Sequence, residues 1–179
     1  MLKKSILILN LIIFLLSTGL IQAQSREYMF KAGFLEKFAR FTDWPNNTNM
    51  DDKTTPFKIC IIGENPFKNI LAKMYKKQKI KNKRVEIFYI SKIEDIKECH
   101  LLFITKEQEK NLLNILLTIK EKPILTVGDT NGYANKGVHI NLYITNKGTI
   151  HFEINEKKVK ESGLRINLML LEVAKIIKN

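Results

Sequence analysis

The sequence predicts an α/β domain of three layers, in which a mostly parallel sheet is flanked by helices. Short apolar runs typical of buried strands alternate with segments whose apolar residues recur at the helical spacing. Such alternation implies crossover connections between parallel strands. Near the C-terminus, two strand patterns flank Asn146–Gly148, which predicts an antiparallel hairpin at one edge of the sheet. The expected architecture is therefore a Rossmann-like mixed sheet.

The first residues have the pattern of a secretion signal. Met1–Lys4 is a short basic region, Ile6–Leu16 is almost entirely apolar, and Ile21–Ala23 is an acceptable cleavage site. The alternative is a retained membrane anchor, but a spanning helix needs about 20 apolar residues and this run is shorter. We therefore expect residues 1–23 to be a signal peptide and residues 24–179 to form a single exported domain.

The expected strands share a high content of isoleucine, leucine, valine and phenylalanine. Those of the parallel part are Phe57–Ile62, Val85–Ile90, Leu101–Ile104 and Ile124–Val127. The arms of the hairpin are Val138–Ile144 and Thr149–Ile154. Of these, Phe57–Ile62 is a short apolar run that ends at Gly63, which is typical of a buried strand.

The first expected helix, within Tyr28–Pro45, has an unusually aromatic face. Its phenylalanines recur at spacings of four, four and three, at Phe30, Phe34, Phe38 and Phe41. The predicted core positions are Phe34 and Phe38, because amphipathic helices normally turn their apolar face inward. The ion-pair spacings Glu27–Lys31 and Glu36–Arg40 suit a solvated opposite face.

Three aromatic residues near the ends of this helix are candidates for partner binding. They are Tyr28, Phe41 and Trp44. Partly exposed aromatic side chains in such places make good binding anchors. The alternative is that they simply complete the core.

Four further helices are expected. Asn65–Pro66 can start one, Lys106–Thr118 forms the second, Asn155 can cap a third that ends at Gly163, and Asn167 can cap the last. In the second, the inward side chains are predicted to be Leu112, Leu113, Leu116 and Leu117. In the last, the apolar residues are Leu168, Leu171, Val173 and Ala174.

The chain is strongly basic. Loss of Lys3 and Lys4 with the signal would lower its formal net charge from +12 to about +10. Codon bias toward lysine is one explanation, and attraction to anionic envelope material is the other. The candidate contacts for such a surface lie in the basic run before the second strand, at Lys76, Lys77, Lys79, Lys81, Lys83 and Arg84. Nucleic-acid binding is disfavoured, because no motif interleaves basic and stacking aromatic residues.

The two cysteines leave two possibilities open. Cys60 and Cys99 each adjoin a predicted strand. In an oxidising compartment an even pair favours a disulfide, and the alternative is two buried free thiols.

An enzyme with a recognisable site is not predicted. The three histidines lack the spacing of a helical metal pair, although His139 and His151 lie on opposite arms of the hairpin and would be able to face each other. No serine has a nucleophile-elbow sequence around it. We expect no cofactor and no metal.

Two loops that follow strands have polar residues with modest binding potential. Gly63–Pro66 lies between a strand and a helix, where α/β domains often bind ligands, but it lacks a glycine-rich phosphate motif and is better explained as a cap. Asp129 would be able to anchor a ligand, although a role in turn geometry is favoured.

The mature chain resembles the YfiR family of periplasmic proteins over nearly its whole length. The motifs that carry this resemblance are, in order, KAGFLEKFARFTDWP, FKICIIGENPF, CHLLFI, ILTVGDTNGYANKGVHINLYI and HFEINEKKVKESGLRINLMLLEVAKII. The resemblance implies a small exported α/β regulator that performs no chemistry. It would bind the periplasmic domain of an inner-membrane diguanylate cyclase and restrain cyclic-di-GMP synthesis and biofilm formation.

The same resemblance implies further partners and a disulfide. An outer-membrane lipoprotein can sequester such a regulator, and a homodimer is compatible with the family. Cys60 and Cys99 fall where family members have a disulfide. The alternative function is a ligand- or cell-wall-sensing module for a histidine kinase or another receptor, and a hydrolase with an unrecognised site comes third.

Overall fold

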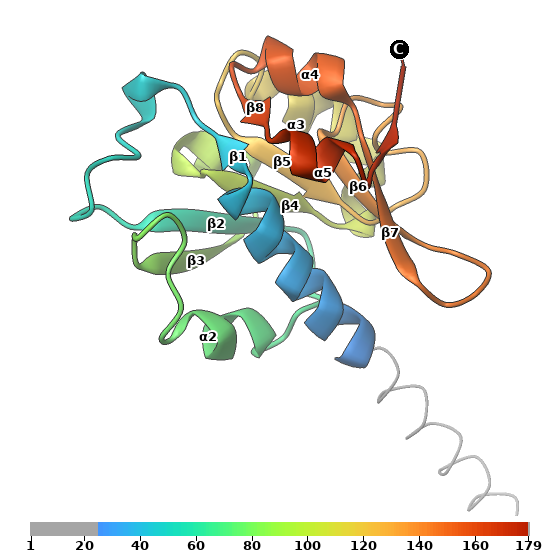
Figure 1. Cartoon of the computed structure of the whole chain (residues 1–179), viewed down its shortest axis with the longest axis horizontal. Coiled ribbons are helices and arrows are strands. Elements are labelled where there is room, and N and C mark those ends of the chain that lie inside the picture. The colour runs from blue at the N-terminus through green and yellow to red at the C-terminus, as the bar shows by residue number, and fades with distance from the viewer. Residues whose placement is uncertain (1–24, 179) are drawn as a thin grey trace, which may run out of the picture.

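A computed structural model describes residues 25–178 as an α/β domain built on a seven-stranded sheet (Figure 1). The strands are β2 (Phe57–Ile62), β3 (Val85–Ile90), β4 (Leu101–Ile104), β5 (Leu125–Gly128), β6 (Ile140–Ile144), β7 (Ile150–Ile154) and β9 (Lys175–Ile176). Their spatial order is β3-β2-β4-β5-β6-β7-β9. Strands β2 to β6 are parallel, and β7 pairs antiparallel with β6. The predicted mixed, mostly parallel sheet with an antiparallel hairpin is confirmed.

The hairpin is not the outermost element of the sheet. Strand β9 pairs parallel with β7 through Glu153↔Lys175 and Ile154↔Ile176, so two residues near the C-terminus form the edge. When the five parallel strands are numbered along the chain, their spatial order in the sheet is second, first, third, fourth, fifth. This is one of the two common doubly wound orders, in which the strand order reverses between β2 and β4.

Helices cover both faces of the sheet. The first helix, described over residues 25–40, lies across one face in Figure 1, and the others are α2 (Ile70–Tyr75), α3 (Leu112–Thr118), α4 (Glu156–Glu161) and α5 (Leu168–Leu171). Short 3-10 helices are η1 (Asn46–Thr48), η2 (Ile93–Glu98) and η3 (Lys106–Asn111). A separate two-stranded sheet joins β1 (Thr42–Asp43) to β8 (Arg165–Ile166).

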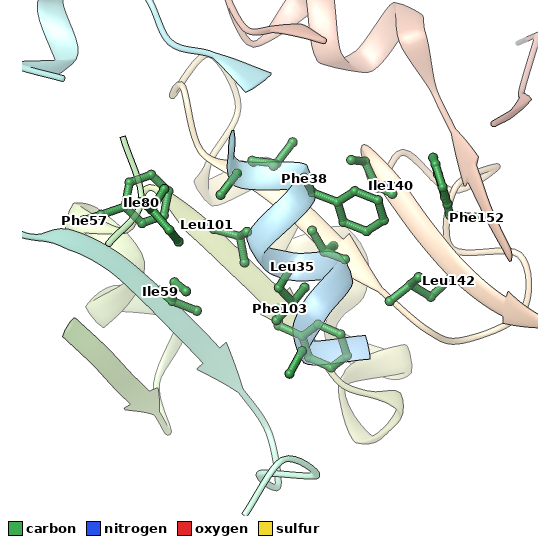
Figure 2. Packing of buried hydrophobic residues seen from close by; sticks show 14 of the residues in the cluster. Leu35, Phe38, Phe57, Ile59, Ile80, Leu101, Phe103, Ile140, Leu142 and Phe152 are labelled. Atoms are coloured by element: carbon green, nitrogen blue, oxygen red, sulfur yellow. The ribbon is translucent and has the colours of Figure 1, made fainter. Parts of the chain in front are cut away.

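Alternate residues of the central strands enter two separate hydrophobic cores. Ile59, Leu101 and Phe103 pack with Leu35 and Phe38 under the first helix, as Figure 2 shows. On the other face, the core includes Cys60, Ile62, Leu102, Ile104 and Ile115. Because successive side chains of a strand point to opposite faces, one continuous apolar run supplies both cores. The three predicted layers are therefore present.

The first helix turns a different face to the sheet from the one that its phenylalanines predict. Its buried apolar positions are Ala32, Leu35, Phe38 and Ala39. Phe38 is in the core as predicted, and Phe34 is only partly buried against Phe38 and Phe152. Phe30, assigned to the same stripe, is 63% exposed. The two alanines explain the shift, because small side chains let a helix approach a sheet more closely than a row of aromatic rings does.

Two other predicted helix faces need correction. In α3 the buried residues are Leu112 and Ile115, whereas Leu113 and Leu117 are exposed. The last helix is only four residues long, and Leu168 and Val173 are exposed while Leu170 is buried. It ends early because pairing of β9 with β7 satisfies backbone groups that a longer helix would otherwise use.

The predicted caps of these short helices are present. The Asn155 side chain accepts a hydrogen bond from the Lys158 N–H, and the Asn167 side chain accepts one from the Met169 N–H. Within residues 25–178, no helix has the length and apolar content needed to cross a bilayer. The predicted signal peptide lies outside the described residues.

Candidate functional site

A polar pocket of about 420 Å³ lies beyond the carboxyl end of β5. Strand β5 pairs with β6 only through Val127↔Ile140 and Gly128↔Asn141, and β6 then continues to Ile144. The pocket lies beside this extension of β6 and against the start of the first helix. Its charged and amide side chains are Glu27, Lys31, Asp129, Asn131, Asn141, Glu153 and Lys175.

Asp129 connects this pocket to the first helix. The Tyr28 hydroxyl donates to Asp129 Oδ2 at 3.0 Å, and Lys31 Nζ donates to the same oxygen at 2.6 Å. Lys31 also forms an ion pair with Glu27, and its side chain is only 5% exposed. Burial and the Asp129 charge raise the pKa of Tyr28, which keeps its phenol protonated as the donor. Asp129 is therefore the anchor of a buried charge cluster as well as a turn residue.

The burial of Lys31 corrects one expectation. The Glu27–Lys31 pair forms, but Lys31 faces Asp129 rather than solvent. The other predicted pair, Glu36–Arg40, forms with Arg40 partly exposed.

A second polar chain crosses the neighbouring strands at the same pocket. Asn141 Nδ2 donates to Glu153 Oε1 at 3.3 Å, and Lys175 Nζ lies 3.3 Å from Glu153 Oε2. These three residues occupy paired positions on β6, β7 and β9. The side-chain oxygen of Asn141 is buried and has no hydrogen-bond partner among the described residues.

Gly128 lets the Tyr133 ring and the Asn141 side chain pack closely against the end of β5. A Cβ at this position would lie 2.7 Å from the Tyr133 ring and 3.2 Å from Asn141 Oδ1. Tyr133 is fully buried and its hydroxyl donates to the Thr105 carbonyl, so its ring has little room to move. The glycine is required here by close packing.

The polar residues of the pocket come from different sequence motifs that lie far apart along the chain. Lys31 comes from KAGF, Asp129 from TVGD, Asn141 from HINLYI and Glu153 from HFEIN. In the sequence, Asp129 was a possible ligand anchor, and Lys31 was one half of an expected exposed ion pair. The other two, Asn141 and Glu153, are visible in the sequence only as polar residues inside an apolar strand. Such a residue indicates a site only once its partner from another part of the fold is known.

The three predicted partner-binding residues are spread between surface and core. Trp44 is only 8% exposed and packs edge-on against Phe57 at 5.4 Å between ring centroids, which leaves little of its ring for a partner. Tyr28 and Phe41 are partly buried. The exposed apolar side chains of this region are instead Met29 and Phe30. A role for any of them in partner binding stays a prediction.

The basic run is mostly a surface feature, with one exception. Lys83 is fully buried, and its ammonium group donates to the carbonyls of Asn49 and Asp52 and to Thr55 Oγ1. It therefore holds the loop before β2 and is not available to an anionic surface. Lys81 is partly buried beside Asp43, and the remaining candidates, Lys76, Lys77, Lys79 and Arg84, are exposed.

Cys60 and Cys99 are joined in a disulfide, the pairing that the resemblance implied, with 5.9 Å between their Cα atoms. The bridge connects β2 to the residue that ends η2 and lies in the core on the α3 side.

The Gly63–Pro66 loop follows β2, where the strand order reverses, and a side chain of the protein itself occupies the space beside it. The carboxylate of Glu107 accepts hydrogen bonds from the Glu64 N–H at 3.3 Å and from Thr105 Oγ1 at 2.6 Å. It thus occupies the place where an external anion would meet the Gly63–Pro66 loop. Asn65 caps this turn by accepting from the Phe67 N–H.

The histidines have structural roles. His139 and His151 do not face each other, because His151 lies opposite Tyr143 in the hairpin. Nδ1 of His139 accepts from the Thr126 N–H at 3.2 Å, and Nδ1 of His100 accepts from the Lys58 N–H at 2.9 Å. Burial lowers the pKa of both histidines to about 4. No group of three metal-binding side chains occurs within the described part of the chain.

His139 is expected to make the domain less stable in mild acid. The unfolded chain takes up the proton near the ordinary pKa of 6.5, whereas the folded chain resists it down to about 4. Its contribution is therefore complete above pH 6.5 and is lost as the pH falls toward 4. Between pH 7 and 4.5 the free energy of unfolding is expected to fall by about 2 kcal/mol because of His139.

Urea unfolding at the two pH values measures this loss. His139→Asn retains an acceptor for the Thr126 N–H. It should reduce by about one the number of protons taken up on unfolding, and so lower the slope of the free energy of unfolding against pH. His151→Asn, the same change at an exposed position, is the matched control. Equal pH slopes for wild type and His139→Asn would contradict the assignment.

The fold and pocket define a class: a three-layer α/β domain with a ligand-sized polar pocket at the strand ends. The chain belongs to the YfiR/HmsC-like family, whose family model matches residues 28–175. At the level of the family, its members are periplasmic regulators of the type that acts on diguanylate cyclases.

Solved structures are similar in fold only. A conserved domain protein from Vibrio cholerae O1 biovar El Tor has a TM-score of 0.51 at 10% identity, over 70% of this chain and 56% of that one. An ABC domain from Streptococcus pneumonia, solved in complex with L-Trp, has a TM-score of 0.48 at 15% identity, over 67% and 55%. The chain thus spans just over half the length of both. No curated protein matches the sequence.

Proposed function

We propose that this protein is a periplasmic regulator that acts by protein–protein contact, with no chemistry of its own. Its partner is the periplasmic domain of an inner-membrane signalling protein, and a diguanylate cyclase fits best. The observation that carries the proposal is the family match over residues 28–175. Binding that favours the inactive state of the cyclase would lower cyclic-di-GMP and restrain biofilm formation by shifting a population of states.

The start of the first helix is the surface that we assign to the partner. Met29 and Phe30 are adjacent exposed apolar side chains. Tyr28 beside them is fixed by Asp129 and by an edge-on contact with Phe67 at 5.3 Å. Large apolar side chains on a rigid support lose little conformational freedom on binding and make effective anchors.

Co-purification from membranes with cross-linking tests the proposal. A diguanylate cyclase with a periplasmic domain is the expected partner, and Phe30→Ala should weaken its capture at least about tenfold. Leu113→Ala, which removes an exposed apolar side chain from α3, is the matched control. The proposal fails if no signalling protein is recovered, and the assigned surface fails if both variants bind equally.

The second candidate is a ligand- or cell-wall-sensing module for a histidine kinase or another receptor. The polar pocket favours it, because ligand pockets typically combine a concave shape with a few placed polar groups. Recovery of a histidine kinase in the same experiment would select this function. Sequestration by an outer-membrane lipoprotein and a homodimer are further proposals that rest on the family resemblance.

A further inference from the structure

We propose that the pocket at the end of β5 binds a small organic amine in its protonated form. The Glu153 carboxylate would receive its N–H donors. This inference goes beyond the proposed regulator function and rests on the pocket alone.

The charges around the pocket favour a cation. Three carboxylates, on Glu27, Asp129 and Glu153, face two lysines, Lys31 and Lys175. Lys31 is buried and shared between Glu27 and Asp129, so it is not free to meet an anion. The net charge of the pocket is therefore negative although the protein as a whole is basic.

Glu153 is neutralised only by a replaceable partner. The side chain of Lys175 is 64% exposed, whereas that of Glu153 is largely buried, and 3.3 Å separates their charged atoms. An exposed lysine gains little from such a pair, because solvent screens the charge and the flexible side chain loses freedom. An ammonium group inside the pocket can take the place of Lys175 at this carboxylate.

Asn141 holds the Glu153 carboxylate in place, because its Nδ2 donates to Glu153 Oε1 at 3.3 Å. Asn141 is 1% exposed, and its Oδ1 has no donor among the described residues. The oxygen points toward Gly128 at the end of β5, since a Cβ built there would lie 3.2 Å from it. This oxygen is buried against the end of β5 and does not open into the pocket. An ammonium group carries three donors and would bind the Glu153 carboxylate that Asn141 holds in place.

The size and walls of the pocket define the rest of the ligand. A volume of about 420 Å³ accommodates a small molecule rather than a bare ammonium ion. Ile144, which is 48% exposed, also lines it and provides a contact for a short carbon chain. The chemical class is thus a small primary amine with an aliphatic body.

Isothermal titration of the mature chain with a four-carbon series tests this inference. Putrescine carries two ammonium groups, 4-aminobutanoate carries one ammonium and one carboxylate, and succinate carries two carboxylates. Putrescine and 4-aminobutanoate are expected to bind, and succinate at least about tenfold more weakly. Equal binding of succinate, or no binding of either amine at millimolar concentration, would overturn the proposal.

Two variants locate the binding groups. Glu153→Gln should weaken putrescine at least about tenfold, and Lys175→Met should tighten it several-fold by removing the competing cation. Glu172→Gln makes the same charge change at an exposed position outside the pocket and should leave affinity unchanged. Lys175 is exposed, so Lys175→Met folds even if Glu153→Gln does not. Unchanged affinity in Lys175→Met would refute the role given to Glu153.

Discussion

Replacing Cys60 and Cys99 together with alanine is expected to lower the free energy of unfolding by about 4 kcal/mol. The bridge closes a loop with a sequence separation of 39 residues, which includes α2, β3 and η2. Closing such a loop removes conformational freedom from the unfolded chain. Both cysteines are also buried, so the variant loses packing in the core on the α3 side. Urea unfolding of the oxidised proteins measures the difference.

Single variants provide the internal control. Cys60→Ala alone breaks the same bridge, so it should cost nearly as much as the double change, and the two single costs should be far from additive. Reduced wild type should unfold close to the double variant. A difference of less than about 1 kcal/mol between oxidised wild type and the double variant would contradict the stabilising role.

Phe38→Ala is expected to destabilise the domain by about 3–5 kcal/mol, because it removes a fully buried ring and leaves a cavity. The ring packs edge-on against Phe152 of β7 at 5.0 Å between centroids, in the core beneath the first helix (Figure 2). Its removal therefore weakens the contact between the first helix and the hairpin. Urea or thermal unfolding provides the measurement.

Phe30→Ala makes the same chemical change two turns earlier in the helix. Phe30 is exposed, so its loss should cost less than about 0.5 kcal/mol. Equal costs at the two positions would mean that the aromatic stripe, rather than the face with Ala32 and Ala39, packs against the sheet.

The strands could be located from the sequence because parallel strands buried on both faces are continuous apolar runs. Phe57–Ile62 is such a run, and its bounds match the structure. Helix faces were harder to predict, since Leu113 and Leu117 are as apolar as the buried Leu112 and Ile115. Which of two adjacent apolar rows meets the sheet depends on the elements around the helix, and local spacing does not contain that information.

The pocket could not be predicted because its polar residues have meaning only as pairs across the fold. Lys31 at the helical spacing from Glu27 predicts an exposed ion pair. Its burial depends on Asp129, which lies 98 residues further along the chain. Glu153 and Asn141 were visible only as polar residues among apolar ones, and the turn at Asn146–Gly148 sets the register that pairs them.

The first helix of the domain and the short strand β1 after it make some of their contacts with parts of the chain that are synthesised last. Phe38 meets Phe152, and Thr42 pairs with Ile166. While the chain is being made, this helix can pack only against the earlier strands, and its contact with β7 is added near the end of synthesis. Contacts between distant segments slow folding. We expect the domain to complete its folding only after the C-terminal strands have been made.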